Sequence, residues 1–122
     1  MSNPNTIVAT SIVESPILMT LTTAQVAVLT NASASGTLLK LNELVAANYS
    51  TSQVTVLAKV YSAAALGGTG YQLIPSVTVP PNSSVVLIDE STAKSITEDK
   101  SVGASASIAS TVDLTGSYKT LT

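Results

Sequence analysis

The fold of this chain is decided between Val79 and Tyr118, where the sequence reads VPPNSSVVLIDESTAKSITEDKSVGASASIASTVDLTGSY. The stretch begins with a proline turn, because Pro81 presets its own φ and Asn82 tolerates the left-handed region beside it. A short apolar strand from Val85 to Ile88 follows, and then an acidic segment from Asp89 to Asp99. These signals predict a β-sheet unit around which the rest of the chain is built.

The end of this stretch, residues 101–118, alternates between apolar or small residues and polar ones. Such alternation is typical of a half-buried strand. We therefore predict a long hairpin in which Ala104 and Ala106 face inward. The inward face of the first strand would hold Val102, Ala104, Ala106 and Ile108. The inward face of the return strand would hold Val112, Leu114, Gly116 and Tyr118.

The longest apolar segment, residues 37–48, fits two kinds of secondary structure. As a strand, Leu39 and Leu41 share a face with Leu44 only if one residue is inserted near Asn42-Glu43, which is the phase slip of a β-bulge. The leucines of this segment also fit the period of a helix. Because β-type segments flank it on both sides, we favour the strand and keep the helix as the alternative.

Several shorter β-prone segments lie elsewhere in the chain, separated by turn residues. Pro16 and Pro75 are expected to interrupt strands, since proline cannot donate to a ladder. Three glycines between Ser62 and Gly70 predict a flexible loop. We predict one antiparallel β-sandwich, Ig-like or jelly-roll-like, of about seven to nine short strands. Its core would be rich in Ala and Val.

Residues 1–16 are predicted to form an N-terminal arm or first strand, and residues 17–122 the sandwich domain. Residues 6–13 are β-prone and uncharged, and no signal peptide is expected before them. Such a segment can form an edge strand of its own sheet, or it can add to the sheet of a neighbour through main-chain hydrogen bonds. We favour the second and expect assembly contacts at Ile7, Val8, Ile12 and Val13.

The composition excludes several classes of function. Hydrophobic residues make up 45% of the 122 residues and charged residues 10%, with a mean hydropathy of +0.44. No apolar run is long enough for a membrane helix, and five scattered lysines without arginine do not form a nucleic-acid surface. With so few charges, we expect partner proteins to cover much of the surface.

Catalytic residues are also hard to find in this sequence. There is no histidine to act as the base of a nucleophilic triad and no cysteine. The carboxylates of residues 89–99 could pair for glycoside chemistry or bind Ca²⁺, but no EF-hand spacing is present. A solvated acidic loop is the favoured interpretation, so we predict no enzyme, no cofactor and no catalytic or metal-binding residue.

A succession of short motifs resembles a known family. The motifs are Val45-Ala46-Ala47-Asn48, Tyr71-Gln72-Leu73, Val79-Pro80-Pro81-Asn82-Ser83-Ser84, Glu98-Asp99, Ala104-Ser105-Ala106-Ser107, and a closing strand from Val112-Asp113 to Ser117-Tyr118. In this order they resemble small β-sandwich structural proteins of tailed phages.

The resemblance implies a structural protein of the virion. The expected function is a capsid decoration or cement protein that stabilises the phage head through subunit contacts. The alternatives are a neck or tail accessory protein, or a small surface- or sugar-binding β module in a fibre. The implied partners are the major capsid protein or other virion proteins, and further copies of the chain as a homo-oligomer, for example a trimer. No nucleic acid and no membrane partner is expected.

Overall fold

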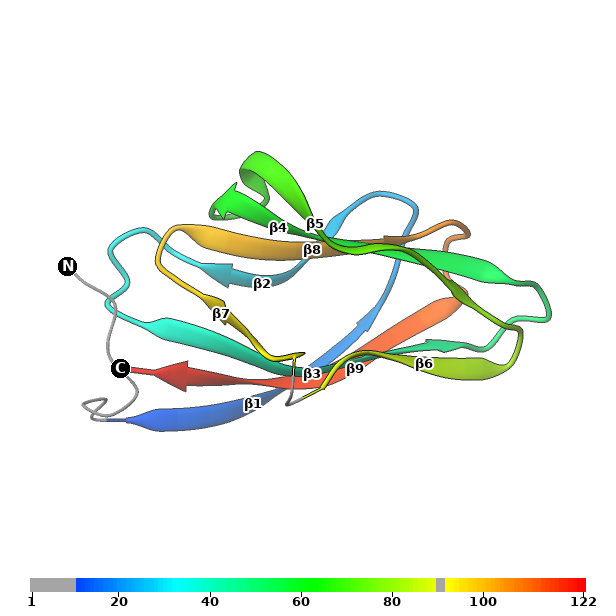
Figure 1. The fold of residues 1–122 in the computed structure, drawn as a ribbon, viewed down its shortest axis with the longest axis horizontal. Coiled ribbons are helices and arrows are strands. Elements are labelled where there is room, and N and C mark those ends of the chain that lie inside the picture. The colour runs from blue at the N-terminus through cyan, green and yellow to red at the C-terminus, as the bar shows by residue number, and fades with distance from the viewer. Residues whose placement is uncertain (1–10, 90–91) are drawn as a thin grey trace.

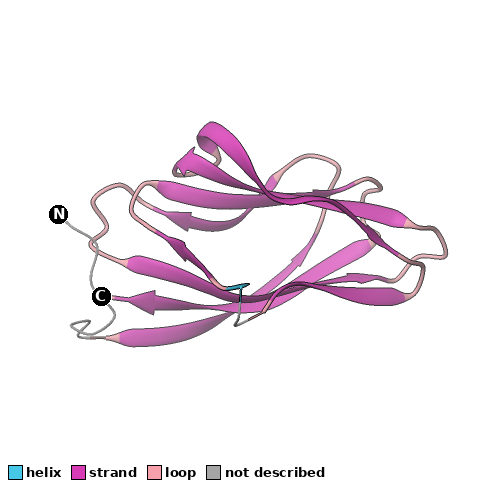
Figure 2. Ribbon diagram, in the orientation of Figure 1, coloured by secondary structure: helices cyan, strands magenta, loops and turns pink. Residues whose placement is uncertain are grey.

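The computed structural model describes residues 11–89 and 92–122. In this part of the chain, nine strands form two antiparallel sheets that pack face to face (Figure 1). Figure 2 shows that both layers consist almost entirely of strand, with short turns between them. The predicted all-β sandwich is therefore confirmed, and Leu38–Asn48 form a strand, as favoured for this segment, instead of the alternative helix.

The sheet drawn lower in Figure 1, which we call sheet A, has the strand order β1-β9-β3-β6, and β7 also pairs with β3. The other sheet, sheet B, has the order β2-β8-β4-β5. The strands of sheet A are β1 (Ile12–Thr20), β3 (Leu38–Asn48), β6 (Ser83–Ile88), β7 (Lys94–Ile96) and β9 (Val112–Leu121). Those of sheet B are β2 (Val26–Asn31), β4 (Val54–Ala63), β5 (Gly67–Val79) and β8 (Lys100–Ala106).

The core between the sheets is built from different residue types on its two sides. Sheet A contributes large aliphatic side chains such as Leu41, Leu44 and Leu114, all fully buried. Sheet B contributes mainly valine and alanine, including Val102 and Ala104. The expectation of an Ala- and Val-rich core is thus correct for sheet B and wrong for sheet A. The leucines increase the apolar area removed from water, since burial stabilises by about 25 cal/mol per Å².

A β-bulge interrupts β3 where the sequence pattern slips. Its register against β9 shifts between Leu41 and Glu43, so that Leu41 and Leu44 both face the core. The bulge also explains Gly116 on β9, because a Cβ atom there would overlap the carbonyl oxygen of Glu43. The predicted bulge is confirmed, and any side chain at Gly116 would force the two strands apart.

The predicted hairpin of residues 101–118 is wrong. Val102, Ala104 and Ala106 do face the core, but β8 pairs with β2 and β4 in sheet B, whereas β9 pairs with β1 and β3 in sheet A. The connection between them crosses from one sheet to the other, and Ile108 lies in it, 42% exposed. Alternation shows which face of a strand is buried, but it carries no information on the partner strand.

Both prolines expected to interrupt strands lie inside strands instead. β1 runs through Pro16, which lies opposite Ser117, and β5 runs through Pro75. β1 and β5 are edge strands, so a proline there can direct its missing N–H away from the ladder. At Pro75 the register against β4 also shifts, and Ser76 has a φ of 44°.

The glycine-rich segment of residues 62–70 is mostly strand and not the predicted flexible loop. β4 continues to Ala63 and β5 begins at Gly67, which leaves a three-residue turn. Ala65 and Leu66 in this turn have φ values of 55° and 61°. The predicted left-handed conformation of Asn82 in the β5–β6 turn is confirmed by a φ of 52°.

Candidate assembly surface

The strand register of sheet A places one exposed row of mainly apolar residues on its outer face. Leu18 lies opposite Thr115, Thr115 opposite Val45, and Val45 opposite Val86, across β1, β9, β3 and β6. Directly opposite residues point to the same face of a sheet. Leu18 is 76% exposed and Val86 61%, while Val45 is partly exposed. We call these four residues the apolar row.

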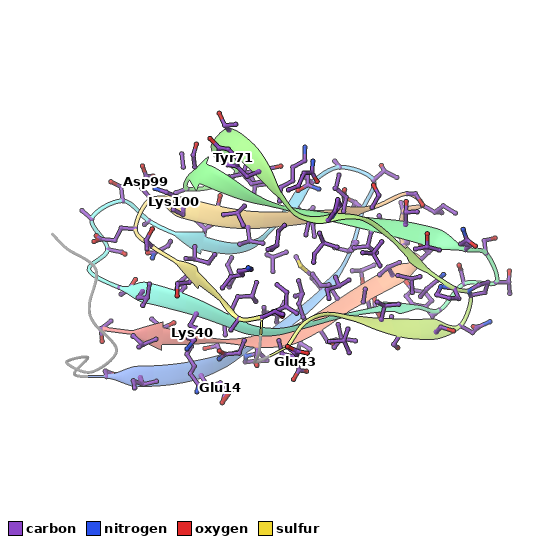
Figure 3. The ribbon with its side chains drawn as sticks, viewed as in Figure 1. Glu14, Lys40, Glu43, Tyr71, Asp99 and Lys100 are labelled. Atoms are coloured by element: carbon purple, nitrogen blue, oxygen red, sulfur yellow. The ribbon has the colours of Figure 1, made fainter. Side chains whose placement is uncertain are left out.

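A row of charged residues crosses the same face. Glu14 lies opposite Lys119, and Lys119 opposite Lys40. Glu43 lies between this charged row and the apolar row, opposite Ser117. Figure 3 shows Glu14 and Glu43 extending from sheet A away from the interior of the sandwich. The outer face of sheet A therefore carries charges of both signs next to exposed aliphatic side chains.

The outer face of sheet B is different, because side chains of the same chain cover its centre. Ser101, Gly103 and Ser105 on β8 point away from the core and are nevertheless buried. A Cβ atom added at Gly103 would lie 2.8 Å from Leu66 Cδ2 and 2.9 Å from Gln25 Oε1. These two side chains form the cover, together with Tyr61.

Hydrogen bonds hold this cover in place. Gln25 Nε2 donates to Ser105 Oγ at 2.8 Å, and Tyr61 Oη donates to Gln25 Oε1 at 3.2 Å. The backbone N–H of Leu66 donates to Ser101 Oγ at 2.9 Å, and that hydroxyl donates to the carbonyl of Ala63 at 2.8 Å. The polar groups on β8 are thus satisfied within the chain.

A shallow hollow of about 220 Å³ lies at one end of the sandwich, lined by Ala47, Asn48, Tyr49, Asn82, Ser83 and Ser84. The Tyr49 hydroxyl donates to the carbonyl of Ser110 at 2.7 Å. The buried amide of Asn48 donates to the carbonyls of Ser52 and Val79 and accepts from Ser50. Asn48 is therefore committed to joining the loops and is not available to a ligand.

Within the described residues, buried polar side chains bond within the chain and no metal-holding group is present. Within residues 11–89 and 92–122, no group of three or more His, Cys, Asp or Glu side chains could hold a metal ion. In the same part of the chain, every buried side-chain nitrogen or oxygen has a hydrogen-bond partner. No helix among these residues has the length and apolar character needed to span a bilayer. The exposed aliphatic side chains of sheet A are the most prominent feature of the described surface.

The residues expected to make assembly contacts lie only partly within the described structure. Ile7 and Val8 lie outside the described residues, as does most of the predicted arm. Ile12 and Val13 are on β1, 58% and 54% exposed, and they pair with Leu121 and Thr120 of the same chain.

The apolar row was not identified from the sequence. A signal was present, because Ile17-Leu18 and Val85-Val86 are adjacent apolar residues, and one of each pair must face outward in a strand. These pairs indicate exposed apolar residues only once it is known that each of the two strands has one face on the outside of the sandwich.

Comparisons with known proteins support a fold relationship only. No family model matches the chain, and no curated protein matches it. Among solved structures, it is similar to a protein of the Bacillus endospore appendages, which form disulfide-linked pili. The two share 12% sequence identity and superimpose with a TM-score of 0.50, over 92% of this chain and 88% of the other.

This finding overturns the resemblance to virion proteins of tailed phages and the functions drawn from it. The similar structure belongs to a bacterial surface appendage, so the assignments to a capsid decoration or cement protein, to a capsid partner and to the virion are wrong. The motifs behind them are short strand and turn sequences, and the sandwich architecture occurs in proteins of unrelated function. They carried information about the fold but not about the assembly in which the fold is used.

Proposed function

We propose that this chain is a structural subunit of a polymeric surface fibre, built from many copies of itself. The observation that carries the proposal is the similarity, over 92% of the chain, to a subunit of a pilus-like appendage. The sequence-based alternative of a β module in a fibre agrees with it, whereas the main interpretation as a virion protein does not. An exposed aliphatic row on an uncovered sheet is further support, since surfaces of this kind mark contact sites.

The proposal assigns no enzymatic activity to the chain. Without histidine, cysteine or arginine, nucleophile and base would have to come from scattered lysines and carboxylates. The contribution of such a subunit is contact area repeated along a fibre. The location that fits this function is the outer surface of a cell or spore.

The contacts between copies of these 122 residues cannot be disulfide bonds. The appendages of the similar structure are disulfide-linked, but the 122 residues here contain no cysteine. Fibres of this chain should therefore withstand reducing agents unchanged. Their stability would instead depend on apolar area and main-chain pairing, both of which denaturants weaken.

The N-terminal segment is one proposed source of such contacts. Ile7, Val8, Ile12 and Val13 would join a neighbouring copy, with Ile12 and Val13 exposed at the start of β1. A deletion that tests this should remove residues 1–10 only, because β1 begins at Ile12 and its pairing with β9 belongs to the sandwich. We expect the shortened chain to fold but to elongate poorly.

Electron microscopy of the purified full chain tests the proposed function. We expect unbranched filaments of uniform width that persist in a thiol reductant and disperse in guanidinium chloride. A chain that remains monomeric at high concentration, or that forms only shapeless aggregates, would contradict the proposal. Matched samples at several ionic strengths show whether charge limits assembly.

A further inference from the structure

We propose that the shallow hollow at the end of the sandwich binds the ring of a neutral sugar. Its lining combines one aromatic side chain, Tyr49, with the polar side chains of Asn82 and Ser84. The volume is about 220 Å³. Pockets for drug-sized ligands measure roughly 300–1,000 Å³, so this hollow suits a ligand of a single ring.

The hollow lies where β3 and β6 end side by side. Ala47 on β3 lies opposite Ser84 on β6. Ala47 points to the same outer face as Val45, because alternate residues of a strand share a face. Its methyl group is short, so the larger side chains of Tyr49 and Asn82 rise around it and leave the hollow between them.

Tyr49 supplies an aromatic surface that is fixed at both ends. Its backbone N–H donates to the carbonyl of Thr111 at 3.0 Å, and its hydroxyl donates to the carbonyl of Ser110 at 2.7 Å. The side chain is nevertheless 53% exposed. Because the hydroxyl proton is already bonded, the part of Tyr49 left for a ligand is the apolar ring. A ring that is immobilised beforehand loses little conformational entropy when a ligand packs on it.

The polar groups on the β6 side of the hollow are not engaged within the described chain. The amide of Asn82 and the hydroxyl of Ser84 can each donate and accept. Within residues 11–89 and 92–122, neither side chain bonds to another group, and both residues are exposed. The backbone N–H of Asn82 donates to the carbonyl of Ser50 at 3.1 Å, which holds the turn in place. A sugar ring fits this combination, since it has an apolar C–H face and hydroxyl groups at its edge.

The charges around the hollow favour a neutral ligand. Asp113 lies opposite Ala47 on β9, and its carboxylate accepts a hydrogen bond from the Thr20 hydroxyl at 2.7 Å. No lysine is among the residues that line the hollow. Lys119 lies on the same strand as Asp113 but about 20 Å along it. An anionic ligand would therefore approach a carboxylate without a compensating cation.

This site goes beyond the proposed fibre, and its binding can be measured on the chain alone. A single open hollow should bind one sugar weakly. Repeated along a fibre, the same hollow would attach to a saccharide surface at many points, which raises the overall affinity without any new contact. The fibre would then hold a surface as well as extend from one.

Saturation-transfer NMR of the full chain with methyl glycosides of glucose, galactose, mannose and N-acetylglucosamine tests the site. This measurement reads the signals of the sugar, so it applies to monomers and filaments alike. We expect at least one glycoside to bind, with the strongest saturation on the C–H protons of one face of its ring. Glycerol is the control for non-specific contact with hydroxyl groups. If none of the four glycosides binds more strongly than glycerol, the proposal is wrong.

Variants locate the binding in the hollow. Tyr49→Ala should weaken it by about tenfold or more, whereas Tyr49→Phe keeps the ring and should bind nearly as the wild type does. Asn82→Gly tolerates the φ of 52° and removes only the amide, so it should weaken binding by about fivefold, the equivalent of one hydrogen bond. Tyr71→Ala is the matched control, since Tyr71 is a 62% exposed tyrosine on β5 of sheet B (Figure 3). Urea unfolding shows whether each variant is folded.

A charged probe tests the role of Asp113. The methyl glycoside of glucuronic acid should bind more weakly than that of glucose, and Asp113→Asn should reduce this difference. Asparagine keeps an acceptor for the Thr20 hydroxyl, so the change removes the charge without removing that hydrogen bond. Equal binding of the two glycosides by the wild type would contradict the preference for a neutral ligand.

The outcomes separate this inference from the proposed function. If filaments form but no glycoside binds, or if folded Tyr49→Ala and Asn82→Gly bind like the wild type, the sugar site is wrong and the fibre remains. If a glycoside binds in the hollow but no filaments appear, the fibre proposal is wrong and the sugar site stands.

Discussion

The outer faces of the two sheets differ in what covers them. On sheet B, Gln25, Tyr61 and Leu66 lie over β8 and satisfy its polar groups, so this strand is buried on both sides. On sheet A, Leu18 and Val86 remain mostly exposed. Both faces arise from alternating strands. The difference comes from Gln25 just before β2, Leu66 in the β4–β5 turn and Tyr61 on β4.

The chain therefore covers β8 with its own side chains, whereas Leu18 and Val86 stay exposed to water in the described structure. Covering β8 requires only small residues beneath the cover, which the sequence supplies as Ser101, Gly103 and Ser105. Sheet A has no such run of small residues on its outer face, and nothing in the described structure corresponds to the cover of β8 there. Variants on the two faces should therefore respond differently, and the following changes test this in order of expected effect.

The largest effect is expected inside the sandwich, where Leu114 of sheet A is fully buried. Leu114→Ala should lower the free energy of unfolding by about 2–5 kcal/mol, because it leaves a cavity beside a fully buried side chain. The next residue, Thr115, faces outward, and Thr115→Val should change stability by less than about 0.5 kcal/mol. Urea unfolding of both variants measures the difference. Equal effects would show that the faces of β9 are assigned wrongly.

A smaller effect is expected beneath the cover of sheet B. Gly103→Val should cost about 1–3 kcal/mol, since its side chain would displace Leu66 and Gln25. Ser84→Val, on the exposed outer face of β6, is the control and should be nearly neutral. Thermal and urea unfolding compare the two. If Gly103→Val stabilised the protein by improving strand propensity, the cover would contribute little.

The hydrogen bonds of the cover can be tested separately from its packing. Gln25→Ala removes the bond to Ser105 and the acceptor for Tyr61, and should cost about 1–2 kcal/mol. Gln72→Ala removes an exposed amide on the edge strand β5 and should have almost no effect. Denaturant midpoints with unchanged slopes would assign the loss to the folded state.

The smallest effect on stability is expected on the open face. Leu18→Ser should change the free energy of unfolding of the monomer by less than about 0.5 kcal/mol, because the side chain is largely in water. Ile17→Ser, one residue away and buried, should destabilise strongly. Unfolding measured at low protein concentration excludes any contribution from association between copies. A large loss in Leu18→Ser would mean that this face is covered in the monomer.

Much of the fold was predictable because it follows from local alternation. The bulge in β3 could be located near Asn42-Glu43 from the phase of its leucines, and Ala104 and Ala106 could be assigned to the core. The pairing of β8 and β9 could not be predicted, because the five-residue connection at 107–111 suits a crossing between sheets as well as a hairpin. Pro16 suggested that a strand ends there. Proline is accepted within an edge strand, and the sequence does not show that β1 lies at the edge of its sheet.

The candidate surface was less predictable than the fold. Leu18 and Val86 are ordinary strand residues, and only the register brings them into one row with Val45. The cover of sheet B depends on a single turn conformation that brings Leu66 back over Gly103. Neither feature is encoded by residues close together in the sequence, so neither leaves a local pattern.

The antiparallel pairing of β1 with β9 has a consequence for mechanical load. Ile12 lies opposite Leu121, and Ser11 and Thr122 exchange backbone hydrogen bonds, so both outer ends of this pair lie at the same end of the sandwich. A force that pulled Ser11 and Thr122 apart would break the hydrogen bonds between β1 and β9 one after another. A force that entered through the sheet faces would load many contacts at once. In a fibre under tension, subunits of this shape would resist best when strain passes between their faces and bypasses their chain ends.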